Sequence, residues 1–128
     1  MLDSLLTPST VAVIGASKTK GKVGYEILYN LLNDKFEGTL VPVNPGATDI
    51  LGVRCWSSLA EFGGQIDLSV IVVPSASVLQ AVKDSVSQGA RAIVVITAGF
   101  KEVDAEGAAM EAEIGEYCKS RGVSLLGP

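Results

Sequence analysis

Hydrophobic residues along this chain come in short unbroken runs and do not alternate with polar residues. Five of these runs are rich in β-branched residues: Val11–Ile14, Leu40–Val43, Leu68–Val73, Ala92–Ile96 and Val123–Leu126. Unbroken apolar runs of this length are typical of strands that are buried on both faces, as in a parallel sheet covered by helices. The pattern therefore predicts five strands in one mostly parallel sheet.

Between the runs, apolar residues recur at the three- and four-residue spacing of amphipathic helices. Three stripes have this spacing, within residues 23–32, 78–86 and 110–118. Ser77-x-x-Gln80 predicts a capping box at the start of the second helix, and Gly89 predicts its end. Asp104 and Gly122 are the expected start and end of the third helix.

Strands that alternate with helices through short connections predict an α/β fold with a doubly wound, mostly parallel, Rossmann-like sheet. The chain has 128 residues, of which 48% are hydrophobic, which suffices for a single domain over residues 1–128. The segment 45–66 is expected to be a long connection with a small edge strand at Ile50–Val53 and a helical turn near Ser57–Phe62. Pro42 lies inside the second run, where its missing N–H is tolerable if the neighbouring strand is short.

The charges are segregated along the chain. The net charge of −4 argues against a nucleic-acid partner, because nucleic-acid binders carry basic surfaces. Lys18, Lys20 and Lys22 lie close together, whereas six carboxylates fall within residues 102–116, which we expect to be a solvated helix face. The absence of histidine removes the commonest general base and a common metal ligand. We predict no catalytic and no metal-binding residue in this chain.

The composition favours a cytoplasmic protein. No apolar run approaches the roughly 20 residues that span a bilayer, so no membrane partner is expected. The first residues also lack the basic region and long apolar stretch of a signal peptide. Cys55 and Cys118 have no metal-like spacing and are expected to be buried free thiols.

The first strand leads into a glycine-containing loop and then into the first helix, which is how α/β proteins build a phosphate site. The loop does not follow the Walker pattern, because five residues separate Gly15 from Gly21 and Val23 replaces the magnesium-binding Ser or Thr. Ser17 replaces the second glycine of the dinucleotide pattern. The sequence therefore predicts a phosphate loop of another kind.

Ligands of open α/β sheets bind beyond the carboxyl ends of the strands. NAD normally needs a carboxylate at the end of the second strand, yet that strand ends at Asn44 and Pro45, and the next acid is Asp49. The loop lysines favour a ligand with additional phosphate charge. FMN sites are usually flanked by aromatic residues, which make up only 5% of this chain.

Several motifs in order carry a resemblance to a known family. They are Val-Ala-Val-Ile-Gly-Ala-Ser-Lys at 11–18, Gly-Lys-Val-Gly-Tyr-Glu at 21–26, Val-Pro-Val-Asn-Pro at 41–45, Ile-Val-Val-Pro at 71–74, Ile-Thr-Ala-Gly-Phe-Lys-Glu at 96–102 and Leu-Leu-Gly-Pro at 125–128. Over about residues 5–128 the chain resembles the N-terminal CoA-binding domain of NDP-forming acyl-CoA synthetases. These are the ADP-forming acetate–CoA ligases, which are relatives of the succinyl-CoA synthetase α subunit.

The resemblance implies that coenzyme A is the cofactor. The first loop would hold its phosphates, the turn after the second strand would lie beside the adenosine, and Pro74 and the Thr97-Ala98 turn would line the pantetheine path. The cofactor-binding residues that it implies are Gly15, Ala16, Ser17, Lys18, Thr19, Lys20, Gly21, Lys22, Val43, Asn44, Pro45, Pro74, Ser75, Thr97 and Ala98. Family members often carry a lysine just after Asn-Pro, where this chain has Gly46-Ala47.

The resemblance also implies partners. In this family the chain continues into domains or subunits that carry a phosphohistidine and an ATP-grasp part, and the whole enzyme makes acyl-CoA from a carboxylic acid, CoA and a nucleoside triphosphate. We therefore expect an excised CoA-presenting domain that is not catalytic alone. Two alternatives remain open: the CoA-binding regulatory domain of a bacterial protein acetyltransferase, and an NAD-binding module.

Overall fold

The computed structural model describes residues 9–96 and 105–126 as strands that alternate with helices. In chain order the elements are β1 (Thr10–Ile14), α2 (Val23–Asn33), β2 (Thr39–Val43), β3 (Asp49–Ile50), β4 (Val53–Arg54), α3 (Leu59–Phe62), β5 (Leu68–Ile71), α4 (Ser75–Ser87), β6 (Ala92–Val95), α5 (Ala105–Ser120) and β7 (Ser124–Leu126). Each of the five apolar runs forms a strand, with bounds that shift by one or two residues.

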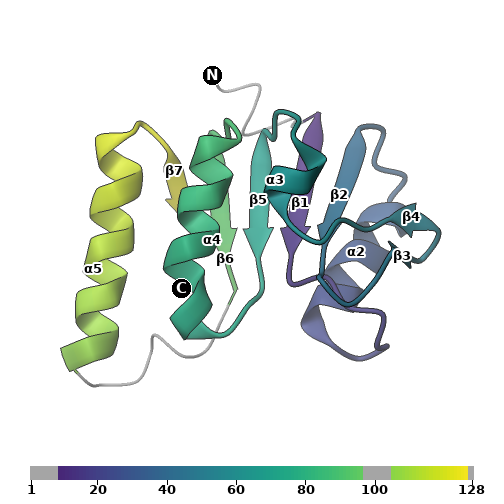
Figure 1. Ribbon diagram of the computed structural model, residues 1–128, viewed down its shortest axis with the longest axis horizontal. Coiled ribbons are helices and arrows are strands. Elements are labelled where there is room, and N and C mark those ends of the chain that lie inside the picture. Colours follow the sequence, from purple (N-terminus) through teal and green to yellow (C-terminus); the bar gives the residue numbers. More distant parts are fainter. Residues whose placement is uncertain (1–8, 97–104, 127–128) are drawn as a thin grey trace.

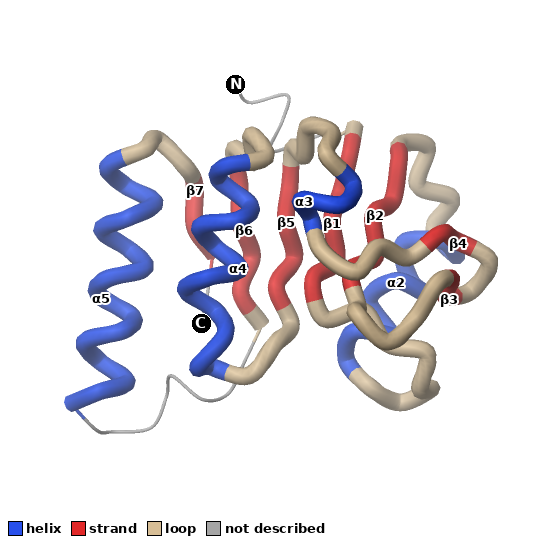
Figure 2. Tube along the Cα trace, in the orientation of Figure 1, coloured by secondary structure: helices blue, strands red, loops and turns tan. Residues whose placement is uncertain are grey.

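Five strands form one sheet in the order β2-β1-β5-β6-β7, and every neighbouring pair is parallel (Figure 1). Helix α2 lies on one face of the sheet, and α3, α4 and α5 lie on the other (Figure 2). The predicted doubly wound α/β fold is thus confirmed. The strand order reverses beside β1, because the chain first adds β2 on one side of it and later adds β5 on the other.

Successive strand residues serve opposite faces, which explains the unbroken apolar runs. Ala12 and Ile71 pack in a buried cluster with Val82 of α4 and with residues of α5. Val13 packs in a second buried cluster, with Leu28 of α2. Both faces of the sheet are therefore apolar, as the unbroken runs require.

The predicted edge strand at Ile50–Val53 is wrong. Instead, β3 and β4 form a separate antiparallel hairpin whose turn is Leu51-Gly52. Both turn residues have positive φ, 53° and 81°, which matches the twist of a two-residue hairpin. The predicted helical turn is confirmed as α3, where the Oγ of Ser58 accepts the N–H of Glu61 at 3.1 Å.

Pro42 is tolerated because β2 is an edge strand. Its carbonyl accepts the N–H of Trp56 at 2.9 Å, so this residue faces away from β1. On that outer side the described residues form a single β-bridge, between Val43 and Trp56. The missing N–H of Pro42 therefore costs no hydrogen bond to β1. The neighbour on the side that Pro42 faces is this single bridge, which fits the expectation of a short neighbour.

The prediction of a capping box at Ser77 is wrong. Helix α4 begins at Ser75 with Pro74 as its N-cap, at φ −56° and ψ 150°, so Ser77 lies inside the first turn. The proline ring presets this φ and places the N-cap three residues before Ser77. Gln80 has another partner, since its Nε2 donates to Oδ1 of Asp84 at 2.9 Å.

The predicted helix ends are confirmed. Gly89 has φ +92° just beyond α4, and Gly122 has φ +70° just beyond α5. Positive φ at this position favours glycine and reverses the chain direction. Asp104, the expected start of α5, lies outside the described residues.

Cys55 and Cys118 are buried free thiols, as predicted, and burial raises the pKa of both.

Glu111, Glu113 and Glu116 of α5 are exposed, as a solvated helix face requires. Among the helices of the described ranges, none is both long enough and apolar enough to cross a bilayer.

Ser69 of β5 is fully buried, and its Oγ has no hydrogen-bond partner among the described residues. Burying an unpaired hydroxyl costs free energy that alanine does not. We expect Ser69→Ala to raise the free energy of unfolding by about 1 kcal/mol, measured by denaturant titration. Ser85→Ala is the control and should gain less, because the buried Oγ of Ser85 donates to the Ala81 carbonyl at 2.8 Å. A loss of stability in Ser69→Ala would contradict the unpaired state of this hydroxyl.

Candidate functional site

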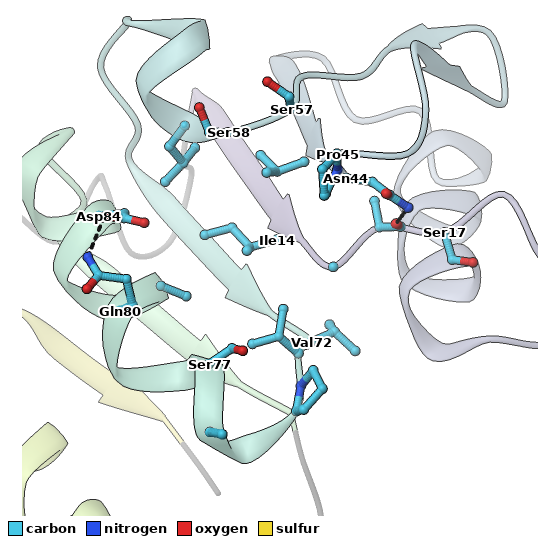
Figure 3. Close-up of a pocket in the computed structure, with 18 of the residues that line it drawn as sticks. Ile14, Ser17, Asn44, Pro45, Ser57, Ser58, Val72, Ser77, Gln80 and Asp84 are labelled. Carbon is cyan, nitrogen blue, oxygen red and sulfur yellow. Dashed lines mark hydrogen bonds between the residues drawn. The ribbon is translucent and has the colours of Figure 1, made fainter.

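A cleft of about 660 Å³ lies at the carboxyl ends of β1, β2 and β5 (Figure 3). Residues 15–17 line it after β1, residues 43–45 at the end of β2, and residues 72–74 after β5. This is the point where the strand order reverses, which is where open α/β sheets bind ligands. The remaining lining residues are Ile14, Lys22, Ser57, Ser58, Leu59, Ala76, Ser77, Gln80, Ala81 and Asp84.

Two glycines bring three backbone segments into direct contact at the cleft. Gly15 has φ +96°, and a Cβ there would lie 2.0 Å from the carbonyl oxygen of Val72. A Cβ on Gly24 of α2 would lie 2.1 Å from the carbonyl oxygen of Gly15. The sequence reasoning missed Gly24, although the last glycine of dinucleotide loops serves the same close packing of helix on strand.

Asn44 joins the loop after β1 to the turn after β2. Its Nδ2 donates to the carbonyl of Ala16 at 2.8 Å, and its Oδ1 accepts the N–H of Gly46 at 2.7 Å. Its backbone N–H donates to the carbonyl of Trp56 at 2.9 Å. One half-buried side chain therefore holds two walls of the cleft together (Figure 3).

Internal hydrogen bonds fold the loop after β1 upon itself. The Oγ of Ser17 accepts the N–H of Thr19 at 3.0 Å, and the carbonyl of Thr19 accepts the N–H of Lys22 at 3.1 Å. The N–H of Gly21 donates to Oε2 of Glu26 at 3.2 Å. In this conformation Lys22 lines the cleft.

The structure brings part of the predicted site together. The predicted site residues that line the cleft are Gly15, Ala16, Ser17, Lys22, Val43, Asn44, Pro45 and Pro74. The predicted residues that do not line it are Lys18, Thr19, Lys20, Gly21 and Ser75. Thr97 and Ala98 lie outside the described residues.

Sequence reasoning missed the wall of the cleft that α3 and α4 provide. Ser58 belongs to it as the N-cap of α3. Ser77, Gln80 and Asp84 belong to it from α4. The spacing of these three residues places them on one helix face, which is the signal that could have revealed a polar wall.

Two titratable groups near the cleft, Glu61 and Cys55, have pKa values that their surroundings shift. The backbone N–H and the hydroxyl of Ser57 both donate to Oε1 of Glu61, at 2.8 and 3.1 Å, and hold the pKa of that carboxyl below its usual value. The Sγ of Cys55 donates weakly to the Asn44 carbonyl at 3.7 Å, and burial raises the pKa of this thiol. Neither group is thus prepared as an acid or a nucleophile near pH 7. No cluster of three or more potential metal ligands occurs within the described ranges.

A parallel sheet with a glycine turn after its first strand and a cleft at its switch point defines a Rossmann-like nucleotide-binding domain. The family model for the CoA binding domain matches residues 9–128. The chain belongs to this family of CoA-binding domains, and the predicted resemblance is confirmed.

Curated relatives and a solved structure agree with the family. The chain is 44% identical over 127 residues to acetate–CoA ligase [ADP-forming] I of Archaeoglobus fulgidus, covering 99% of this chain and 18% of that protein. It is 38% identical over 128 residues to the subunit alpha of acetate–CoA ligase [ADP-forming] II of Pyrococcus furiosus, covering 100% of this chain and 28% of that one. An apo structure of acetyl-coenzyme A synthetase 1 from Ca. Korarchaeum cryptofilum superposes with a TM-score of 0.91 at 40% identity, covering 100% of this chain and 28% of that chain.

The chain thus spans less than a third of the length of these relatives. Coenzyme A is the cofactor of this domain family, as the sequence predicted. The two alternatives, an acetyltransferase regulatory domain and an NAD-binding module, are not favoured by these matches.

Proposed function

We propose that this chain is the CoA-binding domain of an ADP-forming acyl-CoA synthetase and that CoA occupies the cleft at the switch point. The observation that carries the proposal is the cleft itself, which opens beside the glycine loop and has Lys22 in its lining. Helix α2 begins at Val23, so its N-terminal dipole favours phosphate on the same side as this lysine.

The residues of the cleft divide into groups by the part of CoA that they suit. Ser17 and Lys22 suit the phosphates, because a hydroxyl and an ammonium both donate hydrogen bonds to anionic oxygens. Pro45 and Pro74 present apolar surface. Lys18 and Lys20 are exposed residues of the loop after β1 and add positive potential there. Contacts from Thr97 and Ala98 stay a prediction.

Coenzyme A supplies the reacting thiol, so this domain needs only to bind and orient it. The phosphoryl relay would belong to further parts of the protein, which we propose to be a phosphohistidine domain and an ATP-grasp part. This chain has no histidine that could carry the phosphate, and we expect it to form no acyl-CoA alone. A cytoplasmic location stays a prediction.

The acid that is activated would be chosen outside this domain. One relative is named 4-hydroxybutyrate–CoA ligase and another trans-feruloyl-CoA synthase, and both are 36% identical to this chain over nearly all of its length. Because the chain resembles ligases of such different acids to the same degree, we propose that it serves the part of the reaction that these ligases share.

The proposal predicts that CoA binds more tightly than NAD. NAD lacks the 3′-phosphate, and the end of β2 offers Asn44 in place of the carboxylate that NAD sites use. Isothermal titration calorimetry with CoA, 3′-dephospho-CoA and NAD measures the three affinities. Tighter binding of NAD than of CoA would overturn the assignment.

Lys22→Ala provides the matched test of the site. It should weaken CoA binding by about 1–3 kcal/mol, the usual range for a hydrogen bond to a charged group, and the loss should shrink as salt rises. Lys119→Ala, an exposed lysine in the last turn of α5, removes the same charge far from the cleft and should leave the affinity unchanged. Equal effects of the two substitutions would show that only net charge matters.

A further inference from the structure

A groove of about 360 Å³ lies where α4 meets α5, apart from the cleft at the switch point. The two helices pack side by side on the same face of the sheet (Figure 1). Its lining is charged and aromatic and consists of Lys83, Glu113, Glu116, Tyr117, Ser120 and Arg121. None of these six residues lines the cleft. The groove therefore holds two charges of each sign at a place that the proposed function does not use.

The ring of Tyr117 positions both cations of the groove. Cζ of Arg121 lies 3.6 Å from the ring centroid, and Nζ of Lys83 lies 5.7 Å from it. Nη1 of Arg121 also donates to the carbonyl of Tyr117 at 3.4 Å and to Oγ of Ser120 at 3.0 Å. All of these contacts are with neutral groups, which hold the cations in place without cancelling their charge.

The carboxylates of the groove lie on α5, and both Glu113 and Glu116 are exposed. Glu113 precedes Tyr117 by four residues and Arg121 follows Tyr117 by four, a spacing that aligns all three along one side of a helix. At about 1.5 Å per residue, the positions of Glu113 and Arg121 are roughly 12 Å apart along the helix axis. The groove therefore has an acidic end and a basic end, and Tyr117 is midway between them.

A surface with this arrangement is complementary to itself. If a second copy of α5 lies antiparallel to the first with a twofold axis at Tyr117, Glu113 of each chain faces Arg121 of the other. An isologous interface uses the same patch on both chains, so this contact forms twice. A partner of a single charge sign would instead be repelled at one end of the groove.

We propose that this groove is the interface of a twofold-symmetric dimer of this chain, in which α5 packs antiparallel to α5 of the second copy. Lys83 and Glu116 add one further charge of each sign to the same patch. Tyrosine and arginine, which lie at the centre and at the basic end of the groove, are the residue types that often dominate interface energies. The inference goes beyond the proposed function and does not depend on it.

Reversing the charge at one end of the groove tests the dimer. In Glu113→Lys two cations would face each other at each contact, and in Arg121→Glu two carboxylates would do so. Each variant should weaken self-association at least about tenfold in sedimentation equilibrium, because facing like charges repel. The double variant Glu113→Lys/Arg121→Glu restores opposite charges at both contacts and should associate within about threefold of wild type. An equimolar mixture of the two single variants should form a heterodimer.

Controls separate this contact from net charge and from folding. Glu111→Lys makes the same reversal at an exposed residue of α5 outside the groove and should associate as wild type does. Circular dichroism checks that each variant is folded, and Arg121→Gln, which should also weaken association, replaces Arg121→Glu if that variant does not fold. A wild-type chain that stays monomeric up to about 1 mM overturns the dimer. So does an equal loss in Glu111→Lys, or a folded double variant that associates no better than the single variants.

Discussion

Gly24→Ala is expected to lower the free energy of unfolding by about 3 kcal/mol, at the upper end of the usual range for overpacking. The added Cβ would lie 2.1 Å from the carbonyl oxygen of Gly15, which is backbone and cannot rotate away. Helix α2 would have to move off β1, and the glycine loop would move with it. Denaturant titration measures the loss of stability, and CoA affinity should fall in the same variant.

Gly115→Ala provides the control for this substitution. Gly115 lies inside α5, and a Cβ there would meet no atom within 4 Å. Alanine is a better helix former than glycine, so this variant should gain about 0.5–1 kcal/mol. A small loss in Gly24→Ala, comparable with an ordinary surface substitution, would show that α2 does not depend on this close approach.

Asn44→Asp is expected to weaken CoA binding by about tenfold to a hundredfold, or about 1.4–2.7 kcal/mol. The carboxylate would still accept the N–H of Gly46 but could no longer donate to the carbonyl of Ala16, which lies 2.8 Å from the native Nδ2. It would also place a negative charge beside the proposed phosphate loop. Calorimetry at low and at high salt measures both effects, and the repulsive part should shrink as salt rises.

Asn30→Asp makes the same chemical change on the exposed side of α2 and should leave CoA affinity within about twofold of wild type. If Asn44→Asp binds CoA as well as this control, Asn44 does not organise the cleft. A loss that is independent of salt would instead assign the whole effect to the broken hydrogen bond with Ala16.

The fold could be predicted because its signals are local. Each unbroken β-branched run is long enough for one strand, and Gly89 ends α4 where its spacing indicates. The N-cap of α4 was predicted three residues late, because Pro74 sets the backbone before Ser77 can act as a cap. The separate hairpin depends on a positive φ at Leu51, a conformation that a leucine rarely adopts and that the sequence therefore does not indicate.

The candidate site could be predicted only in part, because its walls come from elements far apart in the chain. The glycine loop and Asn44 follow directly from the ends of strands. The wall of Ser58 and Gln80 depends on how α3 and α4 pack across the sheet, which no local pattern reveals. Lys18 and Lys20 lie outside the cleft lining because internal hydrogen bonds at Ser17 and Thr19 fix the loop.

The position of Pro42 bears on self-association. An exposed edge strand offers unpaired N–H and C=O groups, and a second chain can pair with them to begin aggregation. At the carboxyl half of β2 the ring of Pro42 offers no N–H, and Trp56 already occupies its carbonyl. Beside the cleft this edge of the sheet therefore lacks the free N–H and C=O groups that a further strand would need in order to pair with it.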